Sequence, residues 1–520
     1  PMNNYCRHID IFKVAQPFVF LFTSFIGVYL SELVVFEYDS TRLVNLVENI
    51  AFSSLLFSLM VSIFNQNAIK IFKYIFLVLL VFTILEGVYF LIFKAEFTSS
   101  AIFIGLDTNT REIGEFVQFN LASTHLFFAF GVMISFCLSW YFFKPKLPTM
   151  SSFRRLFMLF VASLGIFIMS TTKVQNYNVF FAIVNSVLDY NKQRNQFQNL
   201  KLIQNPFSEV TQLSDSIKTH VIVIGESTSK LHFGLYGYER NTTPMLSEIK
   251  GELKIFSDVV SGDTNTIGSL MEALVIKKDN KLIGNVIQLF KQAGFKTYWL
   301  SNQPPIGMYE TLVTKIGISA DDVRFLNSEN YYLPTTHDEV LIPELHQALS
   351  ETQSKKIIFI HLMGTHANYA YRYPTSFTKY PTNLNDRKLN TINHYDNAVL
   401  YTDHIIRSII ETVRDQIAPA SVLYFSDHGE EVYDSLDFVG HSPNGLFSLN
   451  MVEIPFLLWG SNTFEISESD LKRKFSLDDL SHSIADLFNV YSIDLDPTRS
   501  IFNHSFVERP RIVRDTILVK

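Results

Sequence analysis

The chain has 520 residues, of which 48% are hydrophobic and 18% are charged, and its formal net charge is −7. A net negative charge gives no electrostatic support for binding nucleic acid, so we exclude that class of partner. Both cysteines, Cys6 and Cys137, lie in the first third of the chain, and the remainder therefore contains no disulfide. This does not exclude an oxidising compartment, because a domain of that size buries enough apolar surface to fold without disulfides.

Long apolar runs are concentrated before residue 171, whereas most charged residues follow it. Five of these runs approach the roughly 20 apolar residues that a helix needs to cross a bilayer. The first run is too long for the core of a signal peptide, and no small-residue cleavage site follows it, so we interpret it as a retained anchor. The predicted membrane helices cover residues 17–36, 44–64, 71–93, 118–143 and 154–171.

The short loops between these helices predict their orientation. Lys and Arg gather before the first helix, between the second and third, and between the fourth and fifth, whereas the other two loops are richer in Asp and Glu. By the positive-inside rule, the N-terminus is cytoplasmic. Five crossings then place everything after residue 171 outside the cytoplasm, and we expect residues 1–171 to form a transmembrane domain.

The rest of the chain reads as a linker and one soluble domain. Residues 172–215 are polar and rich in Asn and Gln, and we predict linker helices at the membrane surface. From residue 218, β-rich apolar runs such as VIVIG and IIFIH alternate with amphipathic stretches of helical spacing. This alternation is typical of an α/β domain with a mostly parallel sheet, which we predict over 216–520.

Several predicted strands end in residue types that bind metals. Glu226 follows VIVIG, His366 follows IIFIHLMGT, and Asp427 and His428 follow VLYFS. An ordinary turn is an alternative for each of them, including the tripeptide that begins at Asp427. In a parallel sheet, however, ligands bind beyond the carboxyl ends of the strands, so the repetition favours one shared site.

Thr266 is the candidate nucleophile. It ends the stretch FSDVVSGDTNT, just ahead of the predicted helix IGSLMEAL. Free N–H groups at a helix N-terminus bind phosphate, and a nearby metal would lower the pKa of the hydroxyl. Spacing alone favours an ordinary Thr N-cap, and Thr264 is a competing nucleophile. His441, in VGHSPNG, joins His366 as a candidate for holding a second metal or a phosphate.

Together these segments resemble the phosphoethanolamine transferases of Gram-negative inner membranes, which include enzymes that modify lipid A and give polymyxin resistance. The motifs are VIVIGESTSKLHFGLYGYERNTTP, SGDTNTIGSL, TYWLSNQ, IHLMGTHANYAYRYP, and YFSDHGEEVYD followed by GHSP. The resemblance covers nearly the whole chain and is strongest to cysteine-poor members such as those of Campylobacter, which modify lipooligosaccharide and flagellar components. It implies five membrane helices followed by an alkaline-phosphatase/sulfatase-like domain in the periplasm.

The resemblance also implies roles for the catalytic residues. Glu226, Asp427 and His428 look like the ligands of a catalytic zinc ion. Thr266 looks like the nucleophile, which contacts this zinc and becomes phosphoethanolaminated. Two features depart from the family: the soluble half lacks disulfides, and Ile104 stands where members carry an asparagine.

Further residues match the substrate-binding positions of the family. His366 and His441 match a pair that binds substrate or a second zinc. Thr108 and Glu112 match a pair that holds the ethanolamine group, whose ammonium needs a counter-charge. Asn302 matches an asparagine of the same site.

The implied reaction moves phosphoethanolamine from phosphatidylethanolamine to lipid A or lipooligosaccharide, or to a glycan or flagellar protein, through a phospho-threonine. The nearest alternative is a phosphoglycerol transferase of the lipoteichoic-acid-synthase type. The YGYERNTTP and THANY segments argue against it. A sulfatase would need Cys or Ser, converted to formylglycine, in place of Thr266, and the intact set of candidate ligands argues against a non-catalytic sensor.

Overall fold

The computed structural model describes residues 205–520 with short gaps, the longest at 304–311 and 327–335, together with residues 123–142 and 151–171 and scattered helical positions between 47 and 88 and between 181 and 188. The chain divides into two compact units, and the second contains Lys192–Pro443 and Phe447–Lys520.

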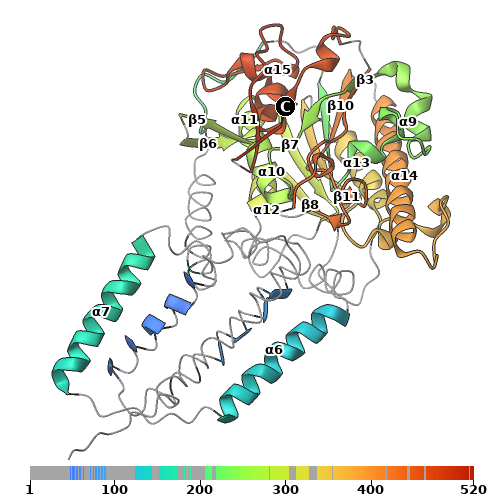
Figure 1. The fold of residues 1–520 in the computed structure, drawn as a ribbon. Helices are drawn as coiled ribbons and strands as arrows, with labels where there is room; N and C mark the ends of the chain where they lie inside the picture. The colour runs from blue at the N-terminus through green and yellow to red at the C-terminus, as the bar shows by residue number, and fades with distance from the viewer. Residues whose placement is uncertain are drawn as a thin grey trace, which may run out of the picture. The chain divides into compact units, whose positions relative to one another are not determined.

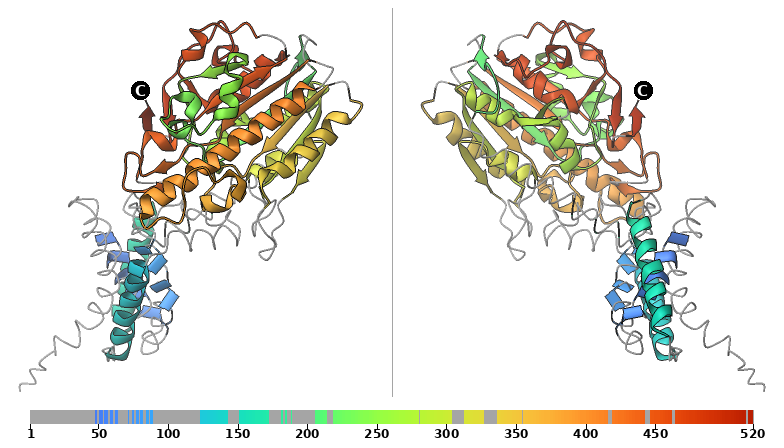
Figure 2. Two further views of the ribbon diagram at one scale, coloured as in Figure 1. Left: turned by 90° about the vertical axis from the view of Figure 1, so that its right-hand side faces the viewer. Right: turned by 90° about the vertical axis from the view of Figure 1, so that its left-hand side faces the viewer.

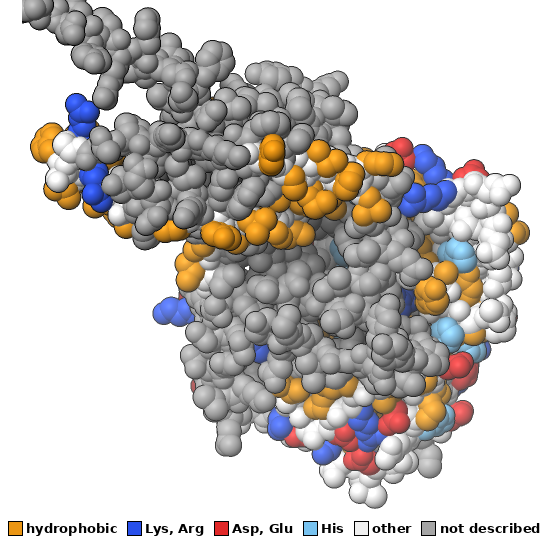
Figure 3. All heavy atoms as spheres, turned by 90° about the horizontal axis from the view of Figure 1, so that it is seen from below, with side chains coloured by type: hydrophobic (Ala, Val, Ile, Leu, Met, Phe, Trp, Pro, Cys, Tyr) orange, Lys and Arg blue, Asp and Glu red, His pale blue; other side chains and the backbone are white. Residues whose placement is uncertain are grey.

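Two long helices are described in the first unit, α6 (Ser123–Phe142) and α7 (Ser152–Thr171), and they overlap the predicted spans 118–143 and 154–171. Within the described part of the chain, α7 is long and apolar enough to cross a membrane, and α6 contains a shorter apolar stretch, His125–Ile134. The aromatic side chains of α7 are largely exposed, as expected of a helix that faces lipid. Figure 3 shows hydrophobic side chains gathered along this helical part.

The structure describes only some residues of the other three predicted helices. The helix predicted at 17–36 lies outside the described residues. Within 44–64 and 71–93, the residues that the structure describes are helical. The described residues therefore agree with helices in these places, but they do not establish a bundle of five.

The second unit is built on a seven-stranded sheet of order β3-β13-β10-β2-β9-β7-β8 (Figure 1). The five strands β10, β2, β9, β7 and β8 are parallel to one another. Strand β13 pairs antiparallel with both β10 and β3. The mostly parallel sheet predicted from the sequence is confirmed. The strands are β2 (Thr219–Gly225), β3 (Leu253–Phe256), β7 (Lys296–Ser301), β8 (Asp322–Phe325), β9 (Lys356–His361), β10 (Ala420–Ser426) and β13 (Phe456–Gly460).

The central strands are buried along their whole length. Every residue of β2, β9 and β10 is buried, because these strands are apolar on both faces. Figures 1 and 2 show helices on each side of the sheet, with α13 and α14 on one face and α10, α11 and α12 on the other. These helices are α10 (Thr266–Ala273), α11 (Val286–Gln292), α12 (Leu312–Gly317), α13 (Leu341–Ser350) and α14 (Arg387–Arg414).

Small two-stranded sheets and short helices complete the described part of this unit. The sheets pair β1 (Thr211–Gln212) with β15 (Val490–Tyr491), β4 (Val259–Val260) with β14 (Phe475–Ser476), β5 (Val275–Lys278) with β6 (Lys281–Asn285), β11 (Glu431–Val432) with β12 (Val439–Gly440), and β16 (Arg511–Val513) with β17 (Ile517–Val519). The helices are α9 (Pro244–Glu248) and α15 (Leu480–Leu487).

The register of the central strands brings their carboxyl ends together. Ser426 of β10 lies opposite Gly225 of β2, and Ile224 lies opposite His361 of β9. Ser301, at the end of β7, lies opposite His361 on the other side. The segments that follow these four strands therefore begin at one edge of the sheet, as the sequence predicted.

Candidate active site and metal centre

Glu226, the residue after β2, is buried at this edge, and its carboxylate is held in place by its neighbours. The Ser227 hydroxyl donates a hydrogen bond to Oε1 of Glu226 at 2.8 Å. Ser227 itself has a left-handed backbone, with a φ of 54°. The hydroxyl of Tyr395, on α14, fixes this turn because it donates to the Ser227 carbonyl at 2.8 Å and accepts from the Ser229 amide at 2.9 Å.

Asp427 and His428 follow β10 and are also buried. Oδ1 of Asp427 accepts from the backbone amides of Ser227 at 3.0 Å and of His428 at 2.7 Å. Nδ1 of His428 lies 2.8 Å from the carbonyl of Gly429, which can only accept, so this nitrogen carries a proton. The other nitrogen, Nε2, faces the acids, at 3.3 Å from Oε1 of Glu226 and 3.6 Å from Oδ2 of Asp427.

These three side chains fit a metal ion. Their candidate ligand atoms all lie within 4.8 Å of one another. Among the residues that the structure describes, buried Oδ2 of Asp427 has no hydrogen-bond partner, which is costly unless another group satisfies it. Two carboxylates and a histidine nitrogen, oriented through its other ring nitrogen, form a donor set that suits zinc, although manganese also accepts oxygen-rich sets.

The electrostatics of the cluster favour a cation. Burial lowers the pKa of His428, but the charge of Asp427 and the hydrogen bond to Glu226 outweigh burial and raise this pKa to about 10. Burial and the charge of Glu226 together raise the pKa of Asp427 to about 6. A divalent cation would therefore displace protons from the cluster when it binds.

Thr266 lies against this cluster. Its Oγ1 is 3.1 Å from Oε2 of Glu226 and 3.4 Å from Nε2 of His428. Thr266 is the first residue of α10 rather than the residue ahead of it, and the N-cap is Asn265, whose side chain accepts from the Gly268 amide at 2.9 Å. The hydroxyl of Thr266 is therefore not used for capping.

The competing candidate, Thr264, is turned toward a different partner. Its buried Oγ1 accepts hydrogen bonds from the guanidinium of Arg514, from Nη2 at 2.7 Å and from Nε at 3.1 Å. Of the two threonines, the geometry favours Thr266 as the nucleophile.

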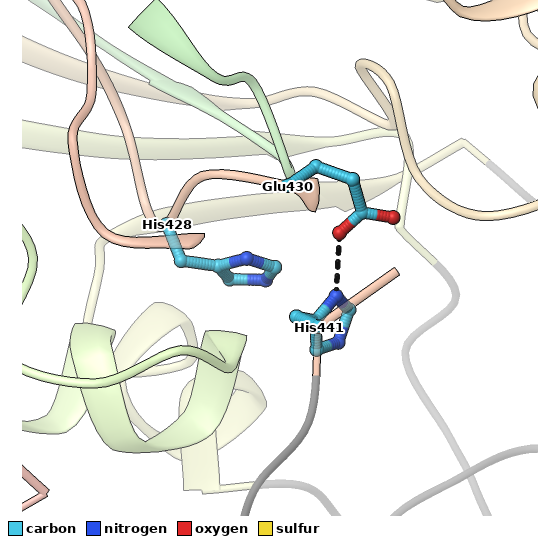
Figure 4. A group of neighbouring side chains, drawn as sticks. All are labelled: His428, Glu430 and His441. Carbon is cyan, nitrogen blue, oxygen red and sulfur yellow. Dashed lines mark hydrogen bonds and ion pairs between the residues drawn. The ribbon is translucent and has the colours of Figure 1, made fainter. Parts of the chain in front are cut away.

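A second group of possible metal ligands adjoins the first and consists of His428, Glu430 and His441 (Figure 4). Nδ1 of His441 lies 2.8 Å from Oε2 of Glu430, and Oε1 of Glu430 accepts from the hydroxyl of Tyr369 at 2.6 Å. The rings of His428 and His441 meet edge to face, with centroids 4.3 Å apart. Burial raises the pKa of Glu430 to about 7, although the charge of His428 opposes the rise.

Glu430 lies in the second group but was not predicted from the sequence. The available signal was its position two residues after His428, in the run DHGEE. Glu431, the next acid in the run, accepts from the amide and hydroxyl of Ser435 at 2.8 Å each and thus supports a turn. Adjacent glutamates in one sequence run therefore have different roles, which the sequence could not distinguish.

The remaining predicted residues differ in their surroundings. His366 is half-buried after β9 and lies near enough to Glu430 for a charge on its ring to act on that carboxyl group. Its backbone carbonyl accepts from Nε of Arg372 at 3.1 Å. Thr108 and Glu112 lie outside the described residues.

Asn302 is buried and faces protein groups instead of the cluster. Its Nδ2 donates to Oδ1 of Asp338 at 2.8 Å, and its Oδ1 accepts from the Thr336 hydroxyl at 2.9 Å. The following residue, Gln303, reaches the site instead, with Nε2 at 3.5 Å from Oε2 of Glu226 and 3.0 Å from the carbonyl of Leu362.

The sequence was compared with known families and proteins. A family model described as Sulfatase matches residues 218–490. Phosphoethanolamine transferase EptC of Escherichia coli K12 is 30% identical over 467 residues, which cover 81% of this chain and 80% of that protein. The chain belongs to the phosphoethanolamine transferases. As a member of this family it is an enzyme with a sulfatase-like domain, which confirms the predicted function and disfavours the phosphoglycerol transferase and sensor alternatives.

Solved structures extend this likeness to the fold. The C-terminal periplasmic domain of EptC from Escherichia coli, crystallised in complex with Zn, is 33% identical and covers 60% of this chain and 95% of its own, with a TM-score of 0.56. The integral membrane protein lipooligosaccharide phosphoethanolamine transferase A (EptA) of Neisseria meningitidis is 19% identical and covers 94% of this chain and 98% of its own, with a TM-score of 0.67. This transferase therefore shares its full-length fold with a membrane-integral protein.

Proposed function

We propose that this transferase is a zinc enzyme of the bacterial inner membrane, with its catalytic domain in the periplasm. In this proposal Thr266 takes phosphoethanolamine from phosphatidylethanolamine and passes it to lipid A or lipooligosaccharide. The observation that carries the proposal is the position of the Thr266 hydroxyl, 3.1 Å from Glu226 and 3.4 Å from His428 within a buried, metal-compatible cluster.

Glu226, Asp427, His428 and Thr266 are the residues that would hold the zinc. When bound, zinc would act as a Lewis acid that favours the alkoxide form of the Thr266 hydroxyl. The donor set described above and the zinc complex of the related EptC domain both support this ion. A second zinc near His366 and His441 is a further part of the proposal, because Glu430 contacts His441 and is close enough to His366 to respond to its charge.

The chain's own residues supply the rest of the chemistry. In the first step, a bond forms between Oγ1 of Thr266 and the phosphorus of the donor, and the bond to the diacylglycerol oxygen breaks. The Thr266 hydroxyl loses its proton, and the departing diacylglycerol oxygen gains one, so that diacylglycerol leaves as an alcohol. The N-terminus of α10, where Thr266 is the first residue, favours the anionic phosphoryl group. Nε2 of His441 remains available to the substrate, since Nδ1 is occupied by Glu430.

In the second step, an acceptor oxygen attacks the phospho-threonine, the bond to Oγ1 breaks, and Thr266 is restored. Thr108 and Glu112 are proposed to bind the ethanolamine group, where the carboxylate of Glu112 would balance the ammonium charge. His366 and Asn302 complete the proposed substrate site, with Asn302 acting through the protein contacts of its amide.

The domain organisation also belongs to this proposal. Residues 1–171 would form the transmembrane domain, 172–215 the linker, and 216–520 the periplasmic catalytic domain. The basic loops predict this orientation, and the related EptC domain, described as a C-terminal periplasmic domain, supports it. The donor lipid would then lie in the same membrane as the enzyme.

Intact-mass analysis of the full chain in lipid nanodiscs tests the proposal. With zinc and phosphatidylethanolamine, we expect a mass increase of one phosphoethanolamine that peptide mapping assigns to Thr266. Nanodiscs of phosphatidylglycerol serve as the control, and an adduct formed only there would replace the proposal with the phosphoglycerol alternative. An adduct on Thr264 would overturn the choice of nucleophile.

A further inference from the structure

Arg514, in the turn between β16 and β17, is bonded to the turn that carries Thr266. Its guanidinium donates to Oγ1 of Thr264 from Nη2 at 2.7 Å and from Nε at 3.1 Å. Its backbone amide donates to the carbonyl of Gly262 at 3.1 Å. Three hydrogen bonds thus join one arginine to the five-residue turn 262–266, which we call the nucleophile turn.

The same guanidinium also contacts the segment that follows His441. Its central carbon lies 5.8 Å from the centroid of the Phe447 ring, within the range of a cation–π contact. Arg514 therefore connects two segments that both contribute to the active site.

The backbone of Arg514 is held in an unfavourable conformation. Its φ is 52°, in the left-handed region that residues with a side chain seldom adopt. The hairpin fixes this conformation, because Val513 and Ile517 pair directly across it. Such strain persists only where surrounding structure imposes it, and here it directs a guanidinium at the nucleophile turn.

The positive charge of the Arg514 guanidinium can offset negative charge at the active site. The phosphoryl group is anionic, and it must approach buried carboxyl groups on Glu226, Asp427 and Glu430. A bound metal ion would offset part of that negative charge. An arginine, which stays protonated and has a rigid planar head, adds a fixed positive charge beside the nucleophile turn.

We propose that Arg514 is a positioning residue of the transfer reaction. It holds the nucleophile turn so that the Thr266 hydroxyl stays against Glu226 and His428, and it offsets negative charge on the side that receives the phosphoryl group. This inference rests on the proposed role of Thr266 and assigns a contribution to the β16–β17 hairpin.

The test measures the rate of Thr266 labelling in a single turnover, on the full chain in phosphatidylethanolamine nanodiscs with zinc. Arg514→Ala should slow labelling about 100-fold, the size of effect expected when a reacting group is slightly misplaced. Arg514→Lys, which keeps the charge but not the paired contact, should slow it about tenfold. Zinc content and Tm should stay at their wild-type values in both variants.

Thr264→Val removes only the hydroxyl that accepts from Arg514 and keeps the side-chain shape. It should slow labelling about tenfold, and the double variant with Arg514→Ala should be no slower than Arg514→Ala alone, since both changes break one connection. The matched control is Arg509→Ala, because Arg509 precedes the same hairpin and pairs with Asp496 at 3.2 Å, outside the site. This control should label at the wild-type rate.

Labelling at the wild-type rate in both Arg514 variants would overturn the inference while leaving the proposed function intact. A second outcome would also overturn the inference. In that outcome Arg514→Ala is labelled more slowly but also loses zinc or has a lower Tm, while Arg514→Lys and Thr264→Val are labelled at the wild-type rate. Arg514 would then have only a structural role. If the wild-type chain is not labelled at Thr266, the proposed function itself fails, and this inference fails with it.

Discussion

Two adjacent histidines of the site, His428 and His441, have opposite electrostatic surroundings. Their ring centroids are 4.3 Å apart, yet the pKa of His428 is raised to about 10, whereas that of His441 is lowered to about 3. Both rings lose solvation by burial, which lowers the pKa in each case. Two carboxylates face His428 and outweigh this effect. At His441 the charge of His428 adds to burial, and together they outweigh the opposing charges of Glu226 and Asp427.

One site therefore contains two different electrostatic environments. The side with Glu226, Asp427 and His428 attracts a cation. The side with His441 favours a neutral ring that can exchange hydrogen bonds with a substrate. Thr266 lies on the first side, within 3.4 Å of His428. We therefore expect substitutions on the two sides to affect metal binding and transfer differently.

The largest effect is expected from removing the Thr266 hydroxyl. Thr266→Ala should abolish phosphoethanolamine labelling, a loss of about 1,000-fold or more, because no other group takes the place of a covalent nucleophile. Thr266→Ser, which keeps the hydroxyl, should retain measurable labelling. Intact-mass kinetics check both variants, and labelled Thr266→Ala would rule out this residue as the nucleophile.

Substitutions on the two sides of the site should change zinc affinity by different amounts. Asp427→Asn should weaken the affinity of the catalytic zinc site at Glu226, Asp427 and His428 about 100-fold, because a buried carboxylate ligand is lost. His441→Asn should change the affinity of this catalytic site less than about threefold, because His441 belongs to the neighbouring group. Competition with a chelator of known affinity measures both. Equal losses in the two variants would contradict the contrast between His428 and His441.

A third histidine, His232, can be used to test whether flanking carboxylates raise the pKa of a buried histidine in this protein. His232 is buried, with Nδ1 at 2.7 Å from Asp396 and Nε2 at 3.1 Å from Asp434. Burial lowers its pKa, but these hydrogen bonds outweigh burial and raise the pKa to about 9. Against an unfolded value near 6.5, the difference corresponds to about 3 kcal/mol of free energy of unfolding.

This contribution of His232 is fully present below about pH 6.5 and is lost as the pH rises through about 9. His232→Gln should therefore lower the free energy of unfolding more at pH 6 than at pH 10. Chemical denaturation of the full chain at both pH values measures the difference. A loss that is independent of pH would mean that His232 is not charged in the folded protein.

The smallest effect is expected at the end of β7, where neighbouring polar residues face different partners. Asn302→Ala leaves Asp338 with one buried donor fewer and should lower the free energy of unfolding by about 1–3 kcal/mol. Gln303→Ala should leave this free energy nearly unchanged and slow labelling instead, since Gln303 contacts Glu226. Denaturation curves and labelling rates distinguish these outcomes, and the reverse pattern would show that the Asn302 side chain, and not that of Gln303, supports the reaction directly.

Much of the fold follows from local sequence patterns. Continuous apolar runs such as VIVIG predicted buried strands, and their alternation with amphipathic stretches predicted a mostly parallel sheet. The apolar run PFLLWG also predicts a strand, but its antiparallel pairing with β10 depends on the path of the chain between them. Glu226, Asp427 and His428 were found because residues directly after parallel strands share one edge.

Contacts between distant segments were decided only by the tertiary structure. Thr264 and Thr266 lie in the same turn of the sequence. In the folded protein the Thr264 hydroxyl accepts from Arg514, which is 250 residues away along the chain, whereas the Thr266 hydroxyl contacts Glu226. Glu430 likewise acquires its partners, Tyr369 and His441, from separate loops. Periodicity and turn residues report what neighbours along the chain impose. Hydrogen-bond partners and raised or lowered pKa values depend on which segments the packed fold brings into contact.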